Sequence, residues 1–546
     1  MIPMLLPLAA APAGVDLAAA YRMATPGLAE WLTILPVAWC LLAGAVLTAL
    51  RGGLNWHAPI AIAALAGLVL LDALLLAHVA ASGPVTMMMG RWLPPFGIAF
   101  TVDMTGALFA LTAAVVAFLV SFQSLGDIDA GRRRYGFYPF LMLLMAGVSG
   151  AFLTGDLFNL YVWFEVLLIS SFGLLVLGSE KAQLDGTVKY GFLNLVATTL
   201  FLVAVGLLYG ALGTLNMADI AAKLAVAPAG VPVMTLAALF LFAFAMKAAA
   251  FPMNFWLPAA YHTPNTVVSA LFAGLLTKVG IYALIRTGVM LMPHATERLA
   301  LPIGLLALAT MLVGSFGALA QDNLRRLFGY IVIAGIGAIL AGVAVGGAEG
   351  LAGALLYALH SMLVMAALYA VAGLARTYAG SERLTTLSGL WTARPLFAGL
   401  SLMLFLSAAG LPPFSGLWPK VMLIKAALET GWWWLAVGLV VMGLLTTLAL
   451  GRVFLLAYWR PDEGKAPQPT APVGGARITL GVVAVMTVLT LGFGLYPQPV
   501  ISAAQQAAAG LLDPVAYQHS VFPTAAQEPG GGAGTGAGAG AGEATP

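Results

Sequence analysis

Residues 155–178 read Gly155-Asp-Leu-Phe-Asn-Leu-Tyr-Val-Trp-Phe-Glu165-Val-Leu-Leu-Ile-Ser-Ser-Phe-Gly-Leu-Leu-Val-Leu-Gly178. This stretch predicts a membrane-spanning helix with a carboxylate inside it. If the helix begins near Asp156, Glu165 lies roughly 13.5 Å deep, close to the middle of a hydrocarbon layer about 30 Å thick. An ionised group at that depth is costly by several kcal/mol or more unless it is paired or hydrated. Glu165 therefore requires a partner from elsewhere in the chain.

The composition places the whole chain in the membrane. Hydrophobic residues make up 61% of the 546 residues and charged residues 8%, against about 25% charged in soluble domains. A chain of this kind is a polytopic membrane protein. The single cysteine, Cys40, allows no internal disulfide, and no cluster of Cys and His indicates a metal centre. No nucleotide-binding motif is present, so the energy must come from an ion gradient or a partner subunit. We expect no metal, no cofactor and no nucleic-acid partner.

Fourteen apolar windows are long enough to span a bilayer, which predicts an all-α membrane protein with about 14 transmembrane helices. Two of the windows, 232–258 and 396–430, are too long and too rich in proline for simple helices. The windows lie near residues 31–50, 58–82, 103–125, 135–154, 156–178, 188–212, 232–258, 265–290, 300–321, 328–347, 351–374, 396–430, 431–458 and 477–500.

The regions outside the spans divide the chain further. Residues 1–28 are an apolar, proline-broken arm; the alternative is a cleaved signal peptide, although no Lys or Arg precedes its Ala-rich stretch. The tail, residues 501–546, is rich in Gly and Ala towards its end, and we expect it to be disordered. The predicted parts are the arm 1–28, the first three helices 29–134, a five-helix repeat 135–290, a second repeat 300–458, a loop with the last helix 459–500, and the tail 501–546.

Positive charges predict the orientation. The odd-numbered connections between spans carry fourteen Lys and Arg, including the run Arg132–Arg134, whereas the even-numbered connections and the termini carry four. Because cytoplasmic loops hold the excess of Lys and Arg, the odd connections are expected in the cytoplasm and both termini outside. Arg286 and Arg452 lie near the ends of their windows, and we expect them to snorkel to an interface.

One buried lysine lies beside a predicted helix break. The seventh window contains Lys247-Ala-Ala-Ala-Phe-Pro-Met-Asn-Phe-Trp-Leu-Pro258. A proline at 252 cannot donate to the carbonyl of Ala248, so the helix loses a bond next to the lysine. Irregular backbone at this depth is tolerated where it lines a wet cavity or is buried in protein. Lys247 is thus predicted to belong to an ion site; the alternative is a bent packing helix with a snorkelling lysine.

The twelfth window repeats this pattern with Gly410-Leu-Pro-Pro-Phe-Ser-Gly-Leu-Trp-Pro-Lys420. Its paired prolines leave the carbonyls of Ala408 and Ala409 without amide partners. Two interrupted, lysine-bearing spans five helices apart predict inverted repeats, spans 4–8 and 9–13, with sites at the midplane. The prolines at the two interruptions are Pro252, Pro258, Pro412 and Pro413.

Lys278 and His360 are also central in their windows. Together with Glu165, Lys247 and Lys420 they form a midplane series of the kind that marks proton pathways in membranes. The imidazole of His360 suits proton transfer near neutral pH, although a lone histidine of this kind is often only a hydrogen-bonding link between helices. Asp72 and Asp103 are interpreted as interfacial or packed polar groups. Secondary candidates are Asp156, which either stabilises a helix N-terminus or lines an outer entrance, His262 and Lys425.

These motifs resemble those of the D component of Mrp-type multisubunit cation/proton antiporters. The stretch Gly-Asp156-Leu-Phe-Asn-Leu-Tyr-Val-Trp-Phe-Glu165 is similar to the fifth-helix signature of that family. Two further stretches, 247–264 and 269–286, resemble its seventh and eighth helices; the second contains Lys278. The motif that ends at Lys420 resembles its broken twelfth helix. The broader family includes the antiporter-like subunits of complex I and of membrane-bound hydrogenases.

The resemblance implies an essential pair, Glu165 and Lys247, and relay lysines at positions 278 and 420. Many relatives carry a lysine where this chain has Met365, so either His360 and water bridge the relay here or the path differs. The implied function is a proton-translocating subunit, not an enzyme, in the bacterial inner membrane, with other antiporter subunits, lipid, H⁺ and Na⁺ or K⁺ as partners. The alternative is a non-redox, proton-pumping subunit of complex I or a hydrogenase.

Overall fold

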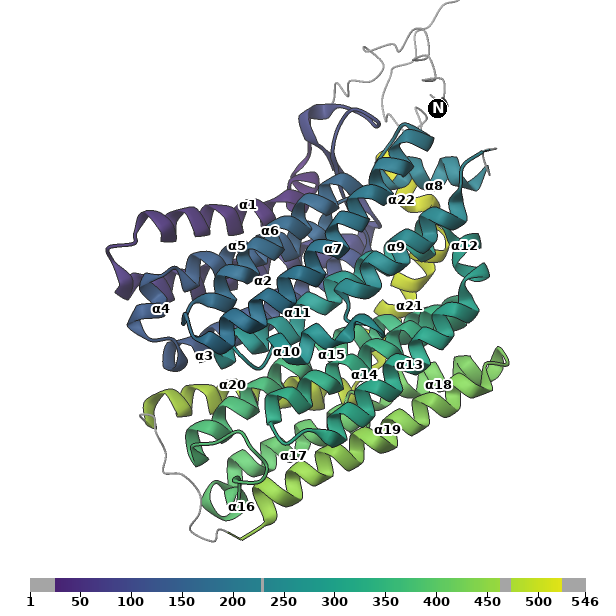
Figure 1. The fold of residues 1–546 in the computed structure, drawn as a ribbon. Coiled ribbons are helices and arrows are strands. Elements are labelled where there is room, and N and C mark those ends of the chain that lie inside the picture. The colour runs from purple at the N-terminus through teal and green to yellow at the C-terminus, as the bar shows by residue number, and fades with distance from the viewer. Residues whose placement is uncertain (1–24, 227–229, 462–472, 523–546) are drawn as a thin grey trace, which may run out of the picture.

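The computed structural model describes residues 25–226, 230–461 and 473–522, and this part of the chain is mostly helical (Figure 1). Eleven of the described helices are long and apolar enough to cross a membrane. Three shorter apolar helices, at Phe137–Leu153, Val233–Lys247 and Pro395–Ala409, bring the spans to fourteen. The all-α membrane fold with two interrupted helices is confirmed. Residues 1–24, with the arm and the signal-peptide alternative, lie outside the described residues.

The N-terminal part consists of three long helices and a small sheet. The helices are α1 (Leu28–Ala49), α2 (Leu54–Ser82) and α3 (Met104–Asp127). Between α2 and α3, strands β1 (Val85–Met88) and β2 (Ala99–Val102) pair antiparallel, flanking the short helix η1 (Met89–Arg91). This hairpin was not predicted from the sequence, because four-residue strands give too short an alternation to stand out between apolar helices.

Two units follow, each with five membrane spans and several short helices between or within the spans. The first contains α4 (Ala130–Arg134), α5 (Phe137–Leu153), α6 (Leu157–Val176), α7 (Lys181–Leu212), α8 (Met217–Ala225), α9 (Val233–Lys247), η2 (Met253–Phe255), α10 (Trp256–Ala260), α11 (Thr266–Ile285), η3 (Arg286–Leu291) and α12 (Pro293–Arg298). The second contains α13 (Ala300–Ala320), α14 (Leu324–Val345), α15 (Gly347–Ala379), α16 (Leu390–Ala393), α17 (Pro395–Ala409), α18 (Leu417–Glu429), α19 (Trp433–Val453) and η4 (Phe454–Trp459).

Both predicted interruptions are present. The seventh span stops when α9 ends at Lys247, and after an irregular turn the chain resumes helix in η2 and α10. The twelfth span stops when α17 ends at Ala409 and resumes in α18. Since five is odd, matching helices of the two units run in opposite directions, and the two breaks fall in matching spans. The units are therefore inverted repeats, spans 4–8 and 9–13.

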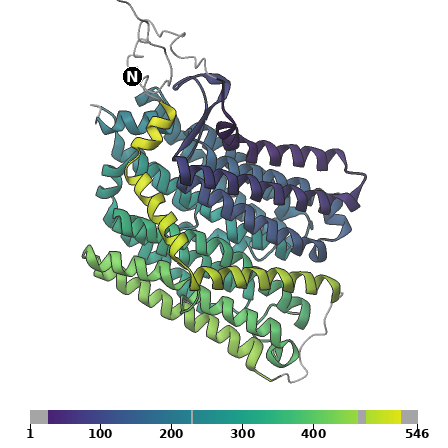
Figure 2. The same ribbon diagram turned by 180° about the vertical axis from the view of Figure 1, so that it is seen from behind.

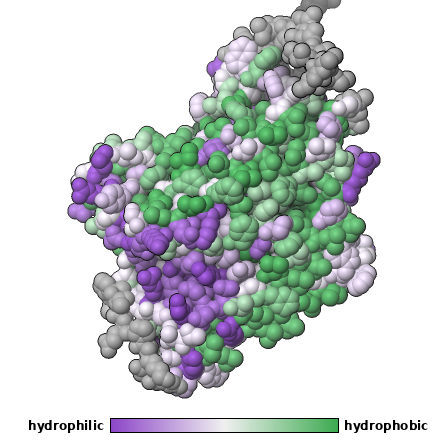
Figure 3. Space-filling view, in the orientation of Figure 1, coloured by the Kyte–Doolittle hydropathy of each residue, from purple (hydrophilic) through white to green (hydrophobic). Residues whose placement is uncertain are grey.

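Polar groups gather on one face of the molecule. Figure 3 shows a continuous hydrophilic area at the left of the view, surrounded by apolar surface. It surrounds an open depression of about 640 Å³, which we call the basic-face cavity. Five consecutive odd-numbered connections contribute to it, so the predicted alternation of the spans holds in the structure. Its charged residues are Asp127, Arg132, Glu180, Arg325, Arg376, Glu382 and Arg383.

The C-terminal segment crosses the opposite face. After the last span, α20 (Val473–Leu495), the helices α21 (Gln498–Leu512) and α22 (Val515–Val521) run back towards the first unit (Figure 2). Ser520 of α22 hydrogen-bonds Thr86 of β1, Oγ to Oγ1, at 2.8 Å. The prediction of a disordered tail from residue 501 is wrong for residues 501–521, because α21 buries an alanine-rich stripe against α15. Residues 523–546 lie outside the described residues.

Candidate functional site

The helix α6 carries Glu165, and Asp156 caps its start. The Oδ1 atom of Asp156 accepts a hydrogen bond from the amide of Asn159 at 2.8 Å, which satisfies an unpaired N–H of the first turn. Further along α6, the Oε1 atom of Glu165 is buried and has no hydrogen-bond partner among the described residues. The structure thus gives Asp156 a capping contact and leaves one oxygen of Glu165 available.

Lys247 lies next to Glu165 without pairing to it. Lys247 is the last residue of α9, is 6% exposed and is close enough to Glu165 for the two charges to interact. No ion pair within 4.0 Å joins them in the described part of the chain. Instead, the Nζ atom lies 4.6 Å from the centre of the Phe164 ring, a cation–π distance. The two side chains are therefore neighbours that are not ion-paired in this structure.

A small cavity of about 10 Å³ adjoins Lys247. Tyr190 and Asn194 of α7 line it together with Trp256 of α10. The amide of Asn194 and the amine of Lys247 are polar groups at its wall, and a space of this size is close to the minimum that holds one water molecule. Sequence reasoning missed Asn194, although an amide in the middle of an apolar helix is a usable signal.

Lys278 lies in the most buried helix. All of the hydrophobic window of α11 is buried, and the Nζ atom of Lys278 donates to the carbonyl of Ala273 at 2.8 Å. Two residues later, a Cβ atom at Gly280 would lie 2.9 Å from the backbone nitrogen of Ala248. Only a glycine lets α11 approach the break so closely. The helix of the second lysine is therefore in direct contact with the break beside the first.

His360 of α15 connects to the break in the twelfth span. Its Nδ1 atom lies 2.8 Å from Oγ of Ser415, and Ser415 lies 3.2 Å from Oγ of Ser407. The charges of Lys278 and Lys420 both act on His360. His360 thus lies between the lysines of the two units. Ser415 was missed from the sequence, although it belongs to the proline motif that ends at Lys420.

The amine of Lys420 bridges the break in the twelfth span. It donates to the carbonyl oxygen of Ala409 and, at 3.4 Å, to that of Ala408. These are the two carbonyls that the paired prolines were expected to leave without amide partners. An ammonium group at the C-terminal end of α17 also suits the negative end of the helix dipole.

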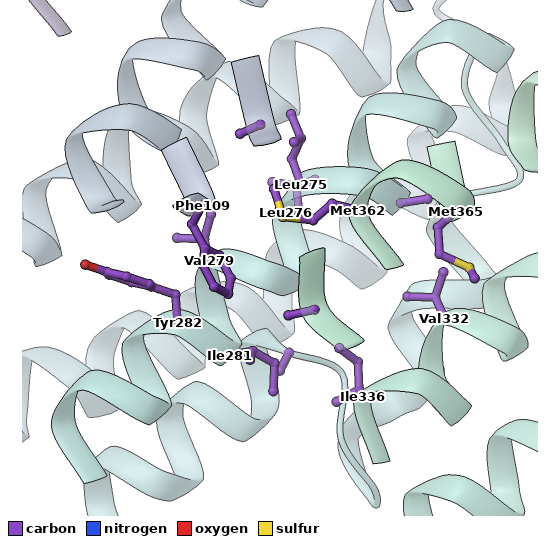
Figure 4. Packing of buried hydrophobic residues seen from close by; sticks show 14 of the residues in the cluster. Phe109, Leu275, Leu276, Val279, Ile281, Tyr282, Val332, Ile336, Met362 and Met365 are labelled. Carbon is purple, nitrogen blue, oxygen red and sulfur yellow. The ribbon is translucent and has the colours of Figure 1, made fainter. Parts of the chain in front are cut away.

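Met365 and Met362 of α15 both lie in apolar contacts. Figure 4 shows Met365 of α15 directed towards Val332 of α14, whereas Met362 packs near Leu275 and Leu276 of α11. Met365 is 3% exposed. The midplane between Lys278 and His360 is therefore bordered by hydrocarbon side chains at this level.

The secondary candidates lie apart from this series. His262 lies in the basic-face cavity, where Nδ1 contacts the carbonyl of Pro258 at 2.8 Å and Nε2 contacts Nη2 of Arg326 at 3.0 Å. Burial and the Arg326 guanidinium lower the pKa of His262 to about 4. Lys425 has a side chain 56% exposed and lies 3.8 Å from Glu429. The structure does not bring either residue to the midplane series.

A buried charge pair joins Asp103, the residue that caps α3, to Arg286, the first residue of η3. Arg286 donates to both carboxylate oxygens of Asp103 at 2.6 Å and to the hydroxyl of Tyr282 at 2.8 Å. The expectation that Arg286 snorkels is wrong, because its side chain is 1% exposed and paired inside the protein.

Known proteins share this sequence and this fold. Residues 154–446 match the family described as NADH:quinone oxidoreductase/Mrp antiporter, TM. The chain is 36% identical to the D component of the Na⁺/H⁺ antiporter of Alkalihalophilus pseudofirmus, over 90% of its length and 99% of that protein. It is 36% identical to the D component of the Na⁺/H⁺ antiporter of Bacillus subtilis, over 89% of its length and 98% of that protein.

Solved structures superpose on most of this chain. A chain of the Mrp complex from Dietzia sp. superposes with a TM-score of 0.83 at 30% identity, covering 91% of this chain and 100% of that one. A chain of the archaeal membrane-bound sulfane sulfur reductase superposes with a TM-score of 0.82 at 25% identity, covering 90% and 99%. Respiratory complex I from Thermus thermophilus shares the fold, with a TM-score of 0.75 at 24% identity, covering 88% and 99%.

Proposed function

We propose a function for this chain, which belongs to the NADH:quinone oxidoreductase/Mrp antiporter transmembrane family. It is the proton-translocating D-type component of a multisubunit monovalent cation/proton antiporter. The single observation that supports this most is the series of titratable groups across both units: the partly buried Glu165, whose Oε1 atom is buried, and the buried Lys247, Lys278, His360 and Lys420. Groups of this kind deep in a membrane protein mark ion and proton pathways.

The first step of the proposed mechanism takes place between Glu165 and Lys247. In the separated geometry the lysine rests on the Phe164 ring, and burial favours its neutral form. When Glu165 approaches, its negative charge favours the ammonium form, so Lys247 takes up a proton. When the two separate, Lys247 releases that proton towards Lys278. The pair thus acts as a switch that loads and unloads the lysine.

The second unit completes the path. Lys278 passes charge to His360, and Ser415 positions the imidazole through its 2.8 Å contact with Nδ1. Lys420 receives the proton while the carbonyls at the end of α17 hold its amine in place. Each transfer moves a charge along the midplane and is coupled to the exchange of Na⁺ or K⁺. The odd-numbered connections face the cytoplasm in this proposal, and the termini face outward.

A second candidate function follows from the likeness to the sulfane sulfur reductase complex at 25% identity. In that case the chain would pump protons within a redox complex. The higher identity to the D components of antiporters, 36% over nine-tenths of the chain, favours antiport. The neighbouring genes provide a quick discrimination, since small antiporter subunits or dehydrogenase subunits would be encoded beside it.

The experiment that tests the proposal is reconstitution of the purified complex into vesicles loaded with a pH-sensitive dye. Addition of Na⁺ or K⁺ against an imposed pH gradient should dissipate that gradient, with no electron donor present. If neither cation moves protons, and only an added electron donor does so, the antiport proposal is refuted and the redox alternative holds.

A further inference from the structure

The helix α2 carries a buried carboxyl group that the proposed relay does not use. Asp72 is 0% exposed, and neither of its carboxyl oxygens has a hydrogen-bond partner among the described residues. It lies ten residues before the end of α2 at Ser82, roughly 15 Å from that end at about 1.5 Å per residue. Asp72 therefore cannot reach either membrane surface by snorkelling.

The surroundings of Asp72 are apolar. It lies on the inward stripe of α2 between the fully buried Leu68 and Leu75. The neighbouring helix α1 places Cys40 within reach of its charge. An ionised carboxylate without a partner is costly by several kcal/mol at this depth, whereas a neutral acid is much less so. Na⁺ or K⁺ would need several oxygen ligands, and this environment supplies one carboxyl group. The ligand that fits the site is a proton.

Two more buried side chains with unpaired atoms lie on α2 and α3. They are His57, through Nδ1, and Gln123, through Oε1. Gln123 also donates from Nε2 to Oδ2 of Asp127 at 2.9 Å, and Asp127 lines the basic-face cavity. Gln123 is therefore linked through Asp127 to this cavity. We call the contact between α2 and α3 the α2–α3 seam.

Other polar groups lie where α5 meets α2 and α3. Ser124 of α3 hydrogen-bonds the hydroxyl of Tyr138 at 3.0 Å, and the Tyr138 ring lies 6.4 Å from the ring of His57. The titratable groups on the elements packed against α2 are Glu30 and Cys40 on α1, Asp103 and Asp127 at the ends of α3, Arg132, Arg133 and Arg134 on α4, and Tyr138 on α5, with His57 and His78 on α2 itself.

We propose that Asp72 is a second proton-binding site of this protein, separate from the midplane series, and that it exchanges its proton with the basic-face cavity along the α2–α3 seam past Gln123. Exchange requires α2 and α3 to part enough for water to enter, because Asp72 lies between the buried apolar side chains of Leu68 and Leu75. The proposal does not depend on the antiport function, since it concerns a different carboxyl group and a different pair of helices.

The test is infrared spectroscopy of the purified complex, wild type against Asp72→Asn. We expect the difference spectrum at neutral pH to contain the C=O stretch of a neutral carboxylic acid, which shifts when the complex is transferred to D₂O. Asp72→Leu, which has a similar volume and no oxygen, should lose the same band and confirms the assignment if the asparagine variant assembles poorly. Absence of the band from both difference spectra would mean that Asp72 is ionised and would overturn the proposal.

The proposed route past Gln123 is tested by the rate at which the C=O band of Asp72 shifts after transfer to D₂O. Gln123→Leu should slow the shift of the Asp72 band by about tenfold, the order expected when one buried polar contact is lost. The matched control is Ser401→Ala, which removes a buried, unpaired hydroxyl from α17 in the second unit and should leave the rate unchanged. An equal rate in Gln123→Leu and wild type would overturn the route through the seam.

Discussion

The amine of Lys420 donates to the carbonyl oxygen of Ala409, the last residue of α17, and so spans the interruption of the twelfth helix. This contact is possible because Gly410 stands between them with φ at +83°. A Cβ atom there would lie 2.5 Å from Cδ of Lys420. The lysine and the helix end are thus held together by the backbone of the break itself.

Substitution of Gly410 by alanine should displace Lys420. The left-handed conformation disfavours any residue with a Cβ atom by about 1 kcal/mol or more, and the added methyl group collides with the lysine. We expect proton transport to fall to a small fraction of the wild-type rate while the protein remains in the membrane. Gly399→Ala on α17, where a Cβ atom meets nothing within 4 Å, is the control. Equal rates in both variants would contradict this role of the contact.

Met365 should tolerate leucine and not lysine. Met365→Leu conserves volume and should change stability by less than about 1.5 kcal/mol. Met365→Lys places an amine against Val332 in an apolar contact, where an unpaired charge is strongly unfavourable. We expect altered coupling, measured as protons moved per cation exchanged at several pH values. Unchanged coupling across the pH range would mean that the path avoids this position.

The pair Asp103–Arg286 should behave as a structural link. Removal of one partner leaves the other buried and uncompensated, at about 3–5 kcal/mol. Arg286→Met alone should therefore lower the melting temperature of the purified complex and reduce assembly. The double variant Asp103→Leu with Arg286→Met should recover much of that loss. If the double variant is as unstable as the sum of both single variants, the pairing is not the source of the effect.

His262 should make the complex sensitive to acid. Its pKa is about 4 in the folded protein and about 6.5 when unfolded, so the unfolded chain binds the extra proton. The stability linked to His262 is present above pH 6.5 and is lost as the pH falls towards 4. His262→Gln should flatten this decline in apparent melting temperature. His294→Gln, at a histidine with an 87% exposed side chain, is the control; identical declines in both variants would argue against the assignment.

The sequence predicted the parts of the site that depend on helix breaks and buried charge. Two prolines in a hydrophobic window are enough to predict unpaired carbonyls, and Lys420 binds those carbonyls in the structure. The alternation of positive charge predicted that the odd connections share a face, and five of them share the basic-face cavity. These features follow from local rules that the fold does not override.

Other parts depend on contacts between distant segments and could not be predicted. Arg286 was expected at an interface because its depth was judged from its own helix, whereas its partner lies 183 residues earlier in the chain. Most of helix α21 falls in the tail that was expected to be disordered, and its contact with α15 holds it in place. The separation of Glu165 from Lys247 is likewise a property of how α6 and α9 pack.

The central claim is that Glu165 and Lys247 form the switch that loads the relay. The direct measurement is cation-driven proton movement in vesicles that contain the complex with Glu165→Ala or Lys247→Ala, beside Lys189→Ala, which removes an exposed lysine paired with Asp185. We predict that both switch variants assemble and lose cation-dependent proton movement, while the control retains it. Near-normal exchange in both switch variants would contradict the claim.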